Sequence, residues 1–156
     1  MGKSLATSKG SAWALLLTAQ AVLVQKIEEH LAKAGLPPLA WYDVLWGLER
    51  SAQHRQRMSD LAERVVLSRS NLTRLVDRLE EAGLVRRERS EEDRRGAYAV
   101  LTESGKALRK KMWPVYQNAI RDLFEAHLSE EDAEALSAVL QHVLDAVRGQ
   151  PAPEGG

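Results

Sequence analysis

The sequence predicts a mainly helical fold that carries one small β-hairpin. Three observations lead to this prediction: apolar residues recur at helical spacing over most of the chain, two short helices are separated by a tight turn, and two short strand-like segments enclose a charged loop. The 156 residues are enough for one compact domain, and a content of 44% apolar and 28% charged residues is ordinary for a soluble globular protein.

The first expected element is a long helix over residues 11–33. It is apolar nearly all round, which is typical of a helix buried from more than one side and suits a subunit interface. Because Lys3 and Lys9 precede the apolar run, a secretion signal is the alternative. Against export, the helical spacing continues through the possible cleavage site and the run is too short to span a bilayer. We therefore expect a flexible N-terminus over residues 1–10 and a cytoplasmic protein without a membrane partner.

The next segment contains two helices separated by a polar loop. Gly35-Leu-Pro-Pro38 ends the first helix, and a second helix is expected over residues 40–51. Residues 53–57 are expected to form the polar loop. Ser59 is the expected N-cap of a short third helix that ends near Val66, because a Ser side chain accepts hydrogen bonds from the free N–H groups of a helix start.

The helix expected over residues 68–82 has the clearest periodicity. Ser68 is its expected N-cap, and Gly83 its expected left-handed stop. Its apolar residues follow the spacing i, i+3, i+4, i+7 and i+10: Leu72, Leu75, Val76, Leu79 and Ala82. Two short capped helices with a tight turn between them form a helix-turn-helix, whose second helix enters a DNA major groove.

A hairpin is expected directly after these helices. Residues 84–89 and 97–101 are strand candidates, and the charged segment between them forms the tip of a wing. The sequence therefore predicts a winged helix-turn-helix DNA-binding lobe over residues 51–114.

Two further helices are expected after the hairpin. Thr102 begins a long helix that reaches about Leu128 and is kinked at Pro114, because proline removes a backbone hydrogen bond. Ser129 begins a capping sequence for the last helix, whose apolar stripe comprises Leu136, Val139, Leu140, Val143, Leu144 and Val147. We expect residues 11–50 and 115–149 to supply N- and C-terminal dimerisation helices, and residues 150–156 to form a disordered tail.

Basic residues are concentrated in the middle of the chain. Residues 50–111 contain 16 Lys and Arg against 10 Asp and Glu, a net charge of +6, whereas the remainder has 6 against 12, a net charge of −6. Of the 16 cations 13 are Arg, whose planar guanidinium binds phosphate or guanine bidentately. This distribution favours a nucleic-acid-binding face, and a solvated basic surface is the alternative.

The polar side of the helix over residues 68–82 is the candidate base-reading face. Arg, Asn, Ser and Thr near the N-terminal end of such a helix supply donors and acceptors for base edges. The candidate DNA-binding residues on this helix are Ser68, Arg69, Ser70, Asn71, Thr73, Arg74 and Arg78. Arg74 is the best single candidate, and the alternative is the ordinary polar face of an amphipathic helix.

The tip of the expected hairpin carries three further candidates, Asp93, Arg94 and Arg95. An Arg at the end of a thin hairpin inserts into a minor groove, where narrow A·T stretches concentrate negative potential. Asp93 then orients a neighbouring Arg by a charge-assisted hydrogen bond. A solvated, charged hairpin end is the alternative interpretation.

Three segments of the chain together carry a family resemblance. They are Leu67-Ser-Arg-Ser-Asn-Leu-Thr-Arg-Leu-Val-Asp-Arg-Leu-Glu-Glu-Ala-Gly-Leu-Val85, Asp93-Arg-Arg-Gly96 and Leu101-Thr-Glu-Ser-Gly105. In these segments, and in the lengths of its flanking helices, the chain resembles the MarR family of bacterial transcriptional regulators. The resemblance implies a homodimer with intertwined terminal helices, a pseudo-palindromic double-stranded DNA operator, and repression that is relieved by a small, often aromatic, anionic effector. It also implies that Asp93 and Arg95 act as a pair, with Arg95 in the minor groove.

Several other kinds of site find no support in the sequence. The chain has no Cys, which excludes disulfides, thiolate metal sites and a Cys nucleophile, and the peroxide-sensing branch of the family fits poorly for the same reason. Its four His residues lack a metal-ligand spacing, so we expect no metal. No phosphate-binding glycine loop, nucleophile elbow or paired-carboxylate motif indicates an enzyme or a cofactor.

Four Trp residues in a chain with one Phe are unusual. On the family's architecture, Trp41 and Trp113 are candidates for lining an effector pocket, and aromatic core or dimer packing is the alternative. The sequence thus predicts a sequence-specific DNA-binding transcriptional regulator, a repressor relieved by a small molecule. A winged-helix protein-interaction module and a small-molecule-binding protein without DNA binding are the alternatives.

Overall fold

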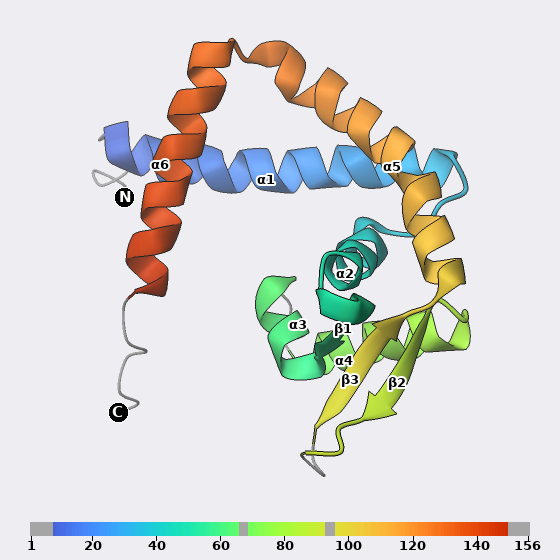
Figure 1. Cartoon of the computed structure of the whole chain (residues 1–156). Coiled ribbons are helices and arrows are strands. Elements are labelled where there is room, and N and C mark those ends of the chain that lie inside the picture. The colour runs from blue at the N-terminus through green and yellow to red at the C-terminus, as the bar shows by residue number, and fades with distance from the viewer. Residues whose placement is uncertain (1–7, 66–68, 93–95, 150–156) are drawn as a thin grey trace. The chain divides into compact units, whose positions relative to one another are not determined.

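The computed structural model of the chain describes residues 8–65, 69–92 and 96–149 (Figure 1). It contains two compact units, formed by residues 1–119 and 120–156. Ser68, the hairpin-tip residues 93–95 and the tail 150–156 lie outside the described residues.

The described residues form a mainly helical structure with one small sheet, as the sequence predicts. The helices are α1 (Ser8–Lys33), α2 (Leu39–Glu49), α3 (Met58–Arg64), α4 (Arg69–Glu81), α5 (Glu103–Leu123) and α6 (Glu130–Arg148), with 3-10 turns η2 (Ala52–His54) and η3 (Glu125–His127). Strands β1 (Arg55–Arg57), β2 (Val85–Arg89) and β3 (Ala97–Leu101) form an antiparallel sheet in the order β1-β3-β2 (Figure 1).

One hydrophobic core joins α2, α3, α4 and the sheet. Its α4 members are Leu72, Leu75, Val76 and Leu79, which are four of the five apolar positions expected there. Ala82 is exposed because α4 ends at Glu81. Each large apolar side chain of this kind contributes roughly 1.5–3 kcal/mol when it is fully buried.

The C-terminal part of α1 packs against α2. Ile27 and Leu31 of α1 are buried, and Glu28 lies between them on the sequence. The N-cap position of α2 is Pro38, which offers no side-chain acceptor, and Glu28 Oε1 instead accepts a hydrogen bond of 2.9 Å from the backbone N–H of Leu39. A carboxylate from a neighbouring helix therefore caps α2.

The N-terminal part of α1 is largely exposed within its unit, and Trp13 retains 59% of its accessible surface. Of the described helices, α1 is long and apolar enough to cross a membrane by length and composition, which corrects the expectation that its apolar run is too short. The difference arises because the expectation counted only the contiguous apolar run inside the helix, whereas α1 as a whole spans 26 residues. One such helix is weak evidence for a membrane, since core helices of soluble proteins and secretion signals share these properties.

The expected polar loop over residues 53–57 contains a strand. β1 pairs with β3, with Arg55 opposite Val100 and Arg57 opposite Tyr98. Because β1 delivers an extended backbone, α3 begins at Met58, and its N-cap is Arg57, with no side-chain cap. The prediction that Ser59 caps this helix is therefore wrong.

The second unit contains α6 and the end of α5. α5 continues through Pro114 but ends at Leu123, five residues before the expected end, because Phe124 leaves the helical conformation with φ −126° and ψ −63°. The predicted cap of α6 is confirmed. Ser129 Oγ accepts a hydrogen bond of 3.0 Å from the N–H of Asp132, and Asp132 Oδ2 accepts one of 3.2 Å from the N–H of Ser129.

Gly105 lets the start of α5 lie directly on the turn that follows α4. A Cβ at this position would lie 2.1 Å from the carbonyl oxygen of Leu84 and 2.8 Å from Leu101 Cδ1. Thr102 ties the same segments together, because its Oγ1 donates a hydrogen bond of 2.7 Å to Gly83 O and accepts one of 3.1 Å from Gly105 N. Gly83 has a φ of +74°, which confirms the predicted left-handed stop.

We expect Gly105→Ala to reduce the free energy of unfolding by at least about 2 kcal/mol and to lower the Tm by about 4–8 °C, because a backbone carbonyl cannot move aside as a side chain can. The matched control is Gly47→Ala, whose new Cβ would lie 3.5 Å from Leu61 Cδ1, an ordinary contact. Thermal denaturation measures both variants. Equal melting temperatures for Gly105→Ala and the wild type would show that α5 can move away from the Leu84 carbonyl without a loss of stability.

Candidate nucleic-acid interface

The packing of α4 determines which of its faces is available to a ligand. Leu72, Val76 and Leu79 are at most 1% exposed, so that side of the helix is fully occupied by the core. The other side carries the predicted residues Asn71, Thr73, Arg74 and Arg78, all of which are exposed. Arg69 and Ser70 occupy the first two positions of α4. The structure therefore places six of the ten predicted DNA-binding residues on one helix.

Two guanidinium groups on this face have no ion-pair partner among the described residues, and they belong to Arg74 and Arg78. Both residues border an open groove of about 310 Å³ between α4 and the start of α2. The groove is lined by Pro38, Ala40, Trp41, Asn71, Arg74, Leu75 and Arg78. Free guanidinium groups on an exposed helix face are suited to phosphate oxygens or to a guanine edge.

The remaining predicted residues, Ser68, Asp93, Arg94 and Arg95, lie outside the described residues. Their assignment to the helix cap and the hairpin tip remains a prediction. β2 and β3 lead to that tip and pair in register from Val85 opposite Leu101 to Arg89 opposite Ala97.

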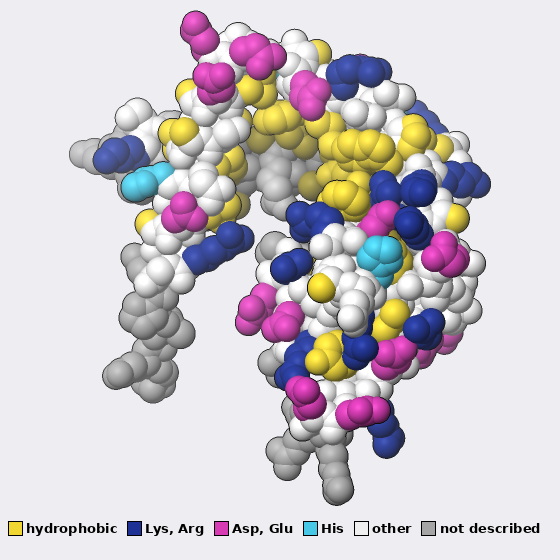
Figure 2. Space-filling view, viewed as in Figure 1, with side chains coloured by type: hydrophobic (Ala, Val, Ile, Leu, Met, Phe, Trp, Pro, Cys, Tyr) yellow, Lys and Arg dark blue, Asp and Glu magenta, His cyan; other side chains and the backbone are white. Residues whose placement is uncertain are grey.

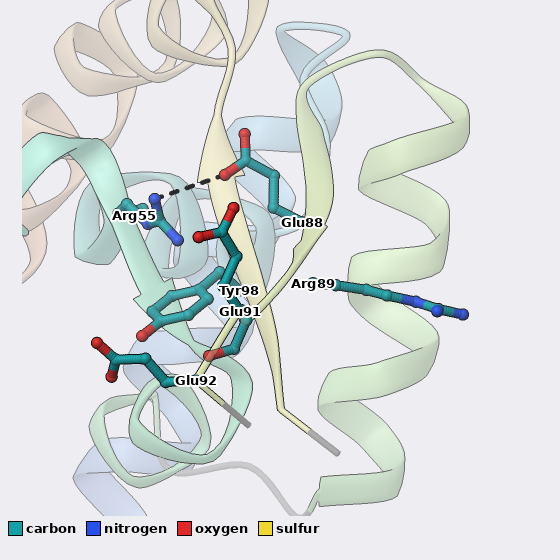
Figure 3. A pocket seen from close by; sticks show the side chains of 7 residues that line it. Arg55, Glu88, Arg89, Glu91, Glu92 and Tyr98 are labelled. Carbon is teal, nitrogen blue, oxygen red and sulfur yellow. Dashed lines mark ion pairs between the residues drawn. The ribbon is translucent and has the colours of Figure 1, made fainter. Parts of the chain in front are cut away.

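One face of the sheet holds an aromatic and charged cluster that sequence reasoning missed (Figure 3). Arg55 Cζ lies 4.2 Å from the ring centroid of Tyr98, and Arg55 Nη1 lies 3.6 Å from Glu88 Oε2. Arg57 Nε donates a hydrogen bond of 3.2 Å to the Tyr98 hydroxyl. These contacts join all three strands. They follow from the pairing of β1 with β3, which the local sequence Arg-Gln-Arg does not signal.

The pocket at this cluster is unsuited to a phosphate backbone. It has a volume of about 350 Å³ and is lined by Arg55, Glu88, Arg89, Ser90, Glu91, Glu92 and Tyr98. Three of these side chains are carboxylates, and Arg89 points away from the others (Figure 3). Acidic and basic side chains are also interspersed over the visible face of the sheet and α3 (Figure 2). Repulsion between carboxylates and phosphates favours the α4 face as the interface instead.

The two predicted pocket residues lie in different surroundings. Trp41 is half-buried against the core and lines the groove beside α4. Trp113 stacks on Tyr42 with ring centroids 5.9 Å apart, and Tyr116 meets the ring of Tyr42 edge-on at 5.0 Å. Burial raises the pKa of both Tyr42 and Tyr116, so both phenols stay protonated at neutral pH. α2 and α5 therefore hold an aromatic cluster, which we name by its residues Tyr42, Trp113 and Tyr116.

A half-buried ion pair links α2 and α5 next to these rings. Glu49 and Arg109 are each 12% exposed, and they form a two-point contact in which Arg109 Nη2 donates 3.1 Å to Glu49 Oε1 while Nε donates to Oε2. The hydrogen bond to Glu49 raises the pKa of Arg109. The guanidinium also lies 5.0 Å from the ring centroid of Trp46. These contacts fix the start of α5 on the core.

Metal binding finds no support in the residues that the structure describes, where no three His, Asp or Glu side chains gather closely enough to hold an ion.

Comparison with known proteins identifies the family. The sequence profile that defines the MarR family matches residues 34–96 of the chain. The chain is similar to the solved structure of AbsC, a MarR family transcriptional regulator from Streptomyces coelicolor, with 37% identity, a TM-score of 0.81, and coverage of 92% of this chain and 97% of AbsC. It is also similar to Sco3205, a MarR family regulator from the same organism solved in complex with DNA, with 29% identity, a TM-score of 0.84, and coverage of 96% and 94%.

Among curated sequences, the chain is similar to the transcriptional repressor MprA of Escherichia coli K12. The two are 32% identical over 97 residues, which are 62% of this chain and 54% of MprA. The chain thus spans about half the length of this relative. The chain is 37% identical to AbsC and covers 97% of that structure, which is enough to assign the family. The chain belongs to the MarR family of transcriptional regulators. The resemblance in the sequence is confirmed.

Proposed function

We propose that this protein is a sequence-specific DNA-binding transcriptional regulator that reads a duplex with the exposed face of α4. The observation that carries the proposal is the division of α4 into a fully buried apolar side and an exposed side with Asn71, Arg74 and Arg78. Membership of a family of transcriptional regulators supports it, as does the DNA complex of Sco3205. A regulator that binds chromosomal DNA acts in the compartment that holds this DNA, so the proposal includes a cytoplasmic location and a role that requires no catalysis.

The chemistry of this face suits base reading in a major groove. The groove admits an α-helix, Arg binds the O6 and N7 atoms of guanine bidentately, and Asn binds the N6 and N7 atoms of adenine. Arg74 lies in the second turn of α4, in the part of a recognition helix that reaches base edges. Arg78 lies one turn further on, where a phosphate contact is the expected role.

We expect Arg74→Ala to weaken binding to a duplex selected by the wild type by about 1–3 kcal/mol and to relax the preference at one base pair per half-site. Titration of the selected duplex and of single-base variants measures both effects. The matched control is Arg121→Ala, an exposed Arg of α5 that pairs with its neighbour Asp122. Equal losses on selected and random DNA would mean that Arg74 contacts only phosphate.

We propose that the protein binds its operator as a homodimer. α6 exposes Val139 and Val147 at 60% each and Val143 at 49%, and the apolar side chains along this helix are visible in Figure 2. A contiguous apolar stripe of this kind marks an interaction surface, and isologous pairing is the commonest way to cover one. A two-fold dimer presents two α4 helices and therefore fits a pseudo-palindromic operator.

Sedimentation is expected to give a dimer at micromolar concentration, and the double substitution Val139→Glu and Val143→Glu is expected to shift the protein towards monomer. Two carboxylates in an apolar interface cannot be paired there, which makes association unfavourable. The control is Glu134→Gln, which changes an exposed side chain of α6 without adding a charge to the apolar stripe. A folded wild-type monomer at that concentration would contradict the dimer.

We propose further that repression is relieved by a small aromatic anion that binds beside the cluster of Tyr42, Trp113 and Tyr116. The rings supply stacking surfaces, and the protonated hydroxyls of Tyr42 and Tyr116 are hydrogen-bond donors for the anion. The cluster bridges α2 and α5, and α2 shares one hydrophobic core with α4, so a ligand there is able to alter how these helices pack.

Fluorescence titration with benzoate tests the effector site. We expect quenching in the wild type that is largely lost in Trp113→Phe and retained in Trp41→Phe, because only Trp113 belongs to the cluster. Quenching that is lost in Trp41→Phe and kept in Trp113→Phe would place the ligand in the groove beside α4 instead.

A further inference from the structure

One guanidinium on the hairpin is bound by three groups of α4. Arg87 of β2 places Nη1 2.5 Å from Asp77 Oδ1 and 3.5 Å from Glu80 Oε1, and its Nη2 donates a hydrogen bond of 3.2 Å to the carbonyl oxygen of Thr73. Thr73, Asp77 and Glu80 follow the spacing i, i+4, i+7 and so share one side of the helix. The Arg87 side chain is only 26% exposed.

A reciprocal contact joins the backbone of the same residue to α4. β2 is an edge strand, because the sheet order is β1-β3-β2, and the N–H groups on its outer side have no strand partner. The N–H of Arg87 donates a hydrogen bond of 2.9 Å to Glu80 Oε2. Glu80 therefore accepts from both the backbone and the side chain of Arg87. The helix covers the open edge of the sheet at this position.

The next residue of β2 is held on the opposite face of the sheet. Successive strand residues point to opposite faces, and Glu88 contacts Arg55 of β1 on the face seen in Figure 3. The strand is thus tied to α4 through Arg87 and to β1 through Glu88. Both ties lie on β2, on the part of the hairpin that the structure describes.

We propose that Arg87 is a positioning residue for specific DNA recognition, which sets the orientation of the hairpin relative to α4. The proposal rests on the function proposed above. The forked contact with two carboxylates and a carbonyl fixes orientation as well as distance. Specific binding requires α4 and the hairpin to engage one duplex together, whereas non-specific binding needs only cations near phosphates. Loosening the contact therefore lowers the preference for the specific site.

The test compares Arg87→Ala, Arg87→Lys and Asp77→Asn with the wild type. Kd is measured for a duplex that the wild type selects from a randomised pool and for a random duplex, over a series of salt concentrations. Arg86→Ala is the matched control, since Arg86 is the preceding Arg of the same strand and pairs within that strand with Glu88 Oε1, whereas Arg55 contacts the other oxygen, Glu88 Oε2. Thermal unfolding of every variant is measured alongside.

We expect Arg87→Ala to reduce the ratio of selected to random affinity at least tenfold, with a salt slope close to that of the wild type. Arg87→Lys restores part of the ratio, because it keeps one charge but loses the fork. Asp77→Asn lowers the ratio as well, and combining it with Arg87→Ala causes little further loss, since both changes break one contact. Arg86→Ala leaves the ratio unchanged.

Three results would overturn the proposal. Equal losses on both duplexes with a salt slope about 0.9 smaller would make Arg87 a phosphate contact. A lower melting temperature with an unchanged affinity ratio would make its role structural only. An unchanged ratio in Asp77→Asn would contradict it even where Arg87→Ala fails to fold. If the wild type selects no duplex at all, it is the proposed function that fails, which separates the two conclusions.

Discussion

The burial of one apolar stripe on α4 is the constraint on which the rest of the structure depends. Leu72, Val76 and Leu79 close the core between α2, α3 and the sheet. A helix at the surface of a domain buries only one of its sides in the core. Once these residues are buried, the polar residues between them must face outward. Rotating α4 to bury Arg74 would leave an unpaired charge inside the core, which is far more costly than losing one apolar contact. The stabilising side of α4 therefore specifies its ligand-binding side.

The distribution of Arg contacts refines what the local charge excess means. Arg55, Arg87 and Arg109 are paired with carboxylates and serve to join elements of the lobe. Arg74 and Arg78 have no such pairing among the described residues, although they lie in the same basic segment. A net charge counted along the sequence thus combines cations that build the lobe with cations that are available to a ligand, and only the structure separates the two groups.

Features with a local physical cause were predictable from the sequence. The apolar period of α4, the left-handed Gly83 and the capping box at Ser129 each depend on residues that are close together in the sequence. Features that depend on distant pairing were not. β1 exists because Arg55 to Arg57 meet β3 more than forty positions later, and that pairing also removed the expected cap at Ser59.

The residues of the candidate site also fall into a group that the sequence predicts and a group that it does not. The exposed residues of α4 were predictable, because a helical period gives both faces at once. Arg87 was not, since its partners at Asp77 and Glu80 are brought to it by the turn after α4 and by the free edge of β2. Trp41 and Trp113 were selected by residue type, and residue type does not reveal that one lies beside α4 and the other on Tyr42.

Methylation interference on a duplex selected by the protein tests the central claim most directly, because it distinguishes the groove that α4 enters. Methylation at guanine N7 blocks the major groove, and methylation at adenine N3 blocks the minor groove. If the exposed face of α4 reads base edges, N7 methylation of at least one guanine in each half-site abolishes binding in the wild type. Binding that tolerates N7 methylation at every guanine of the selected duplex would contradict the account.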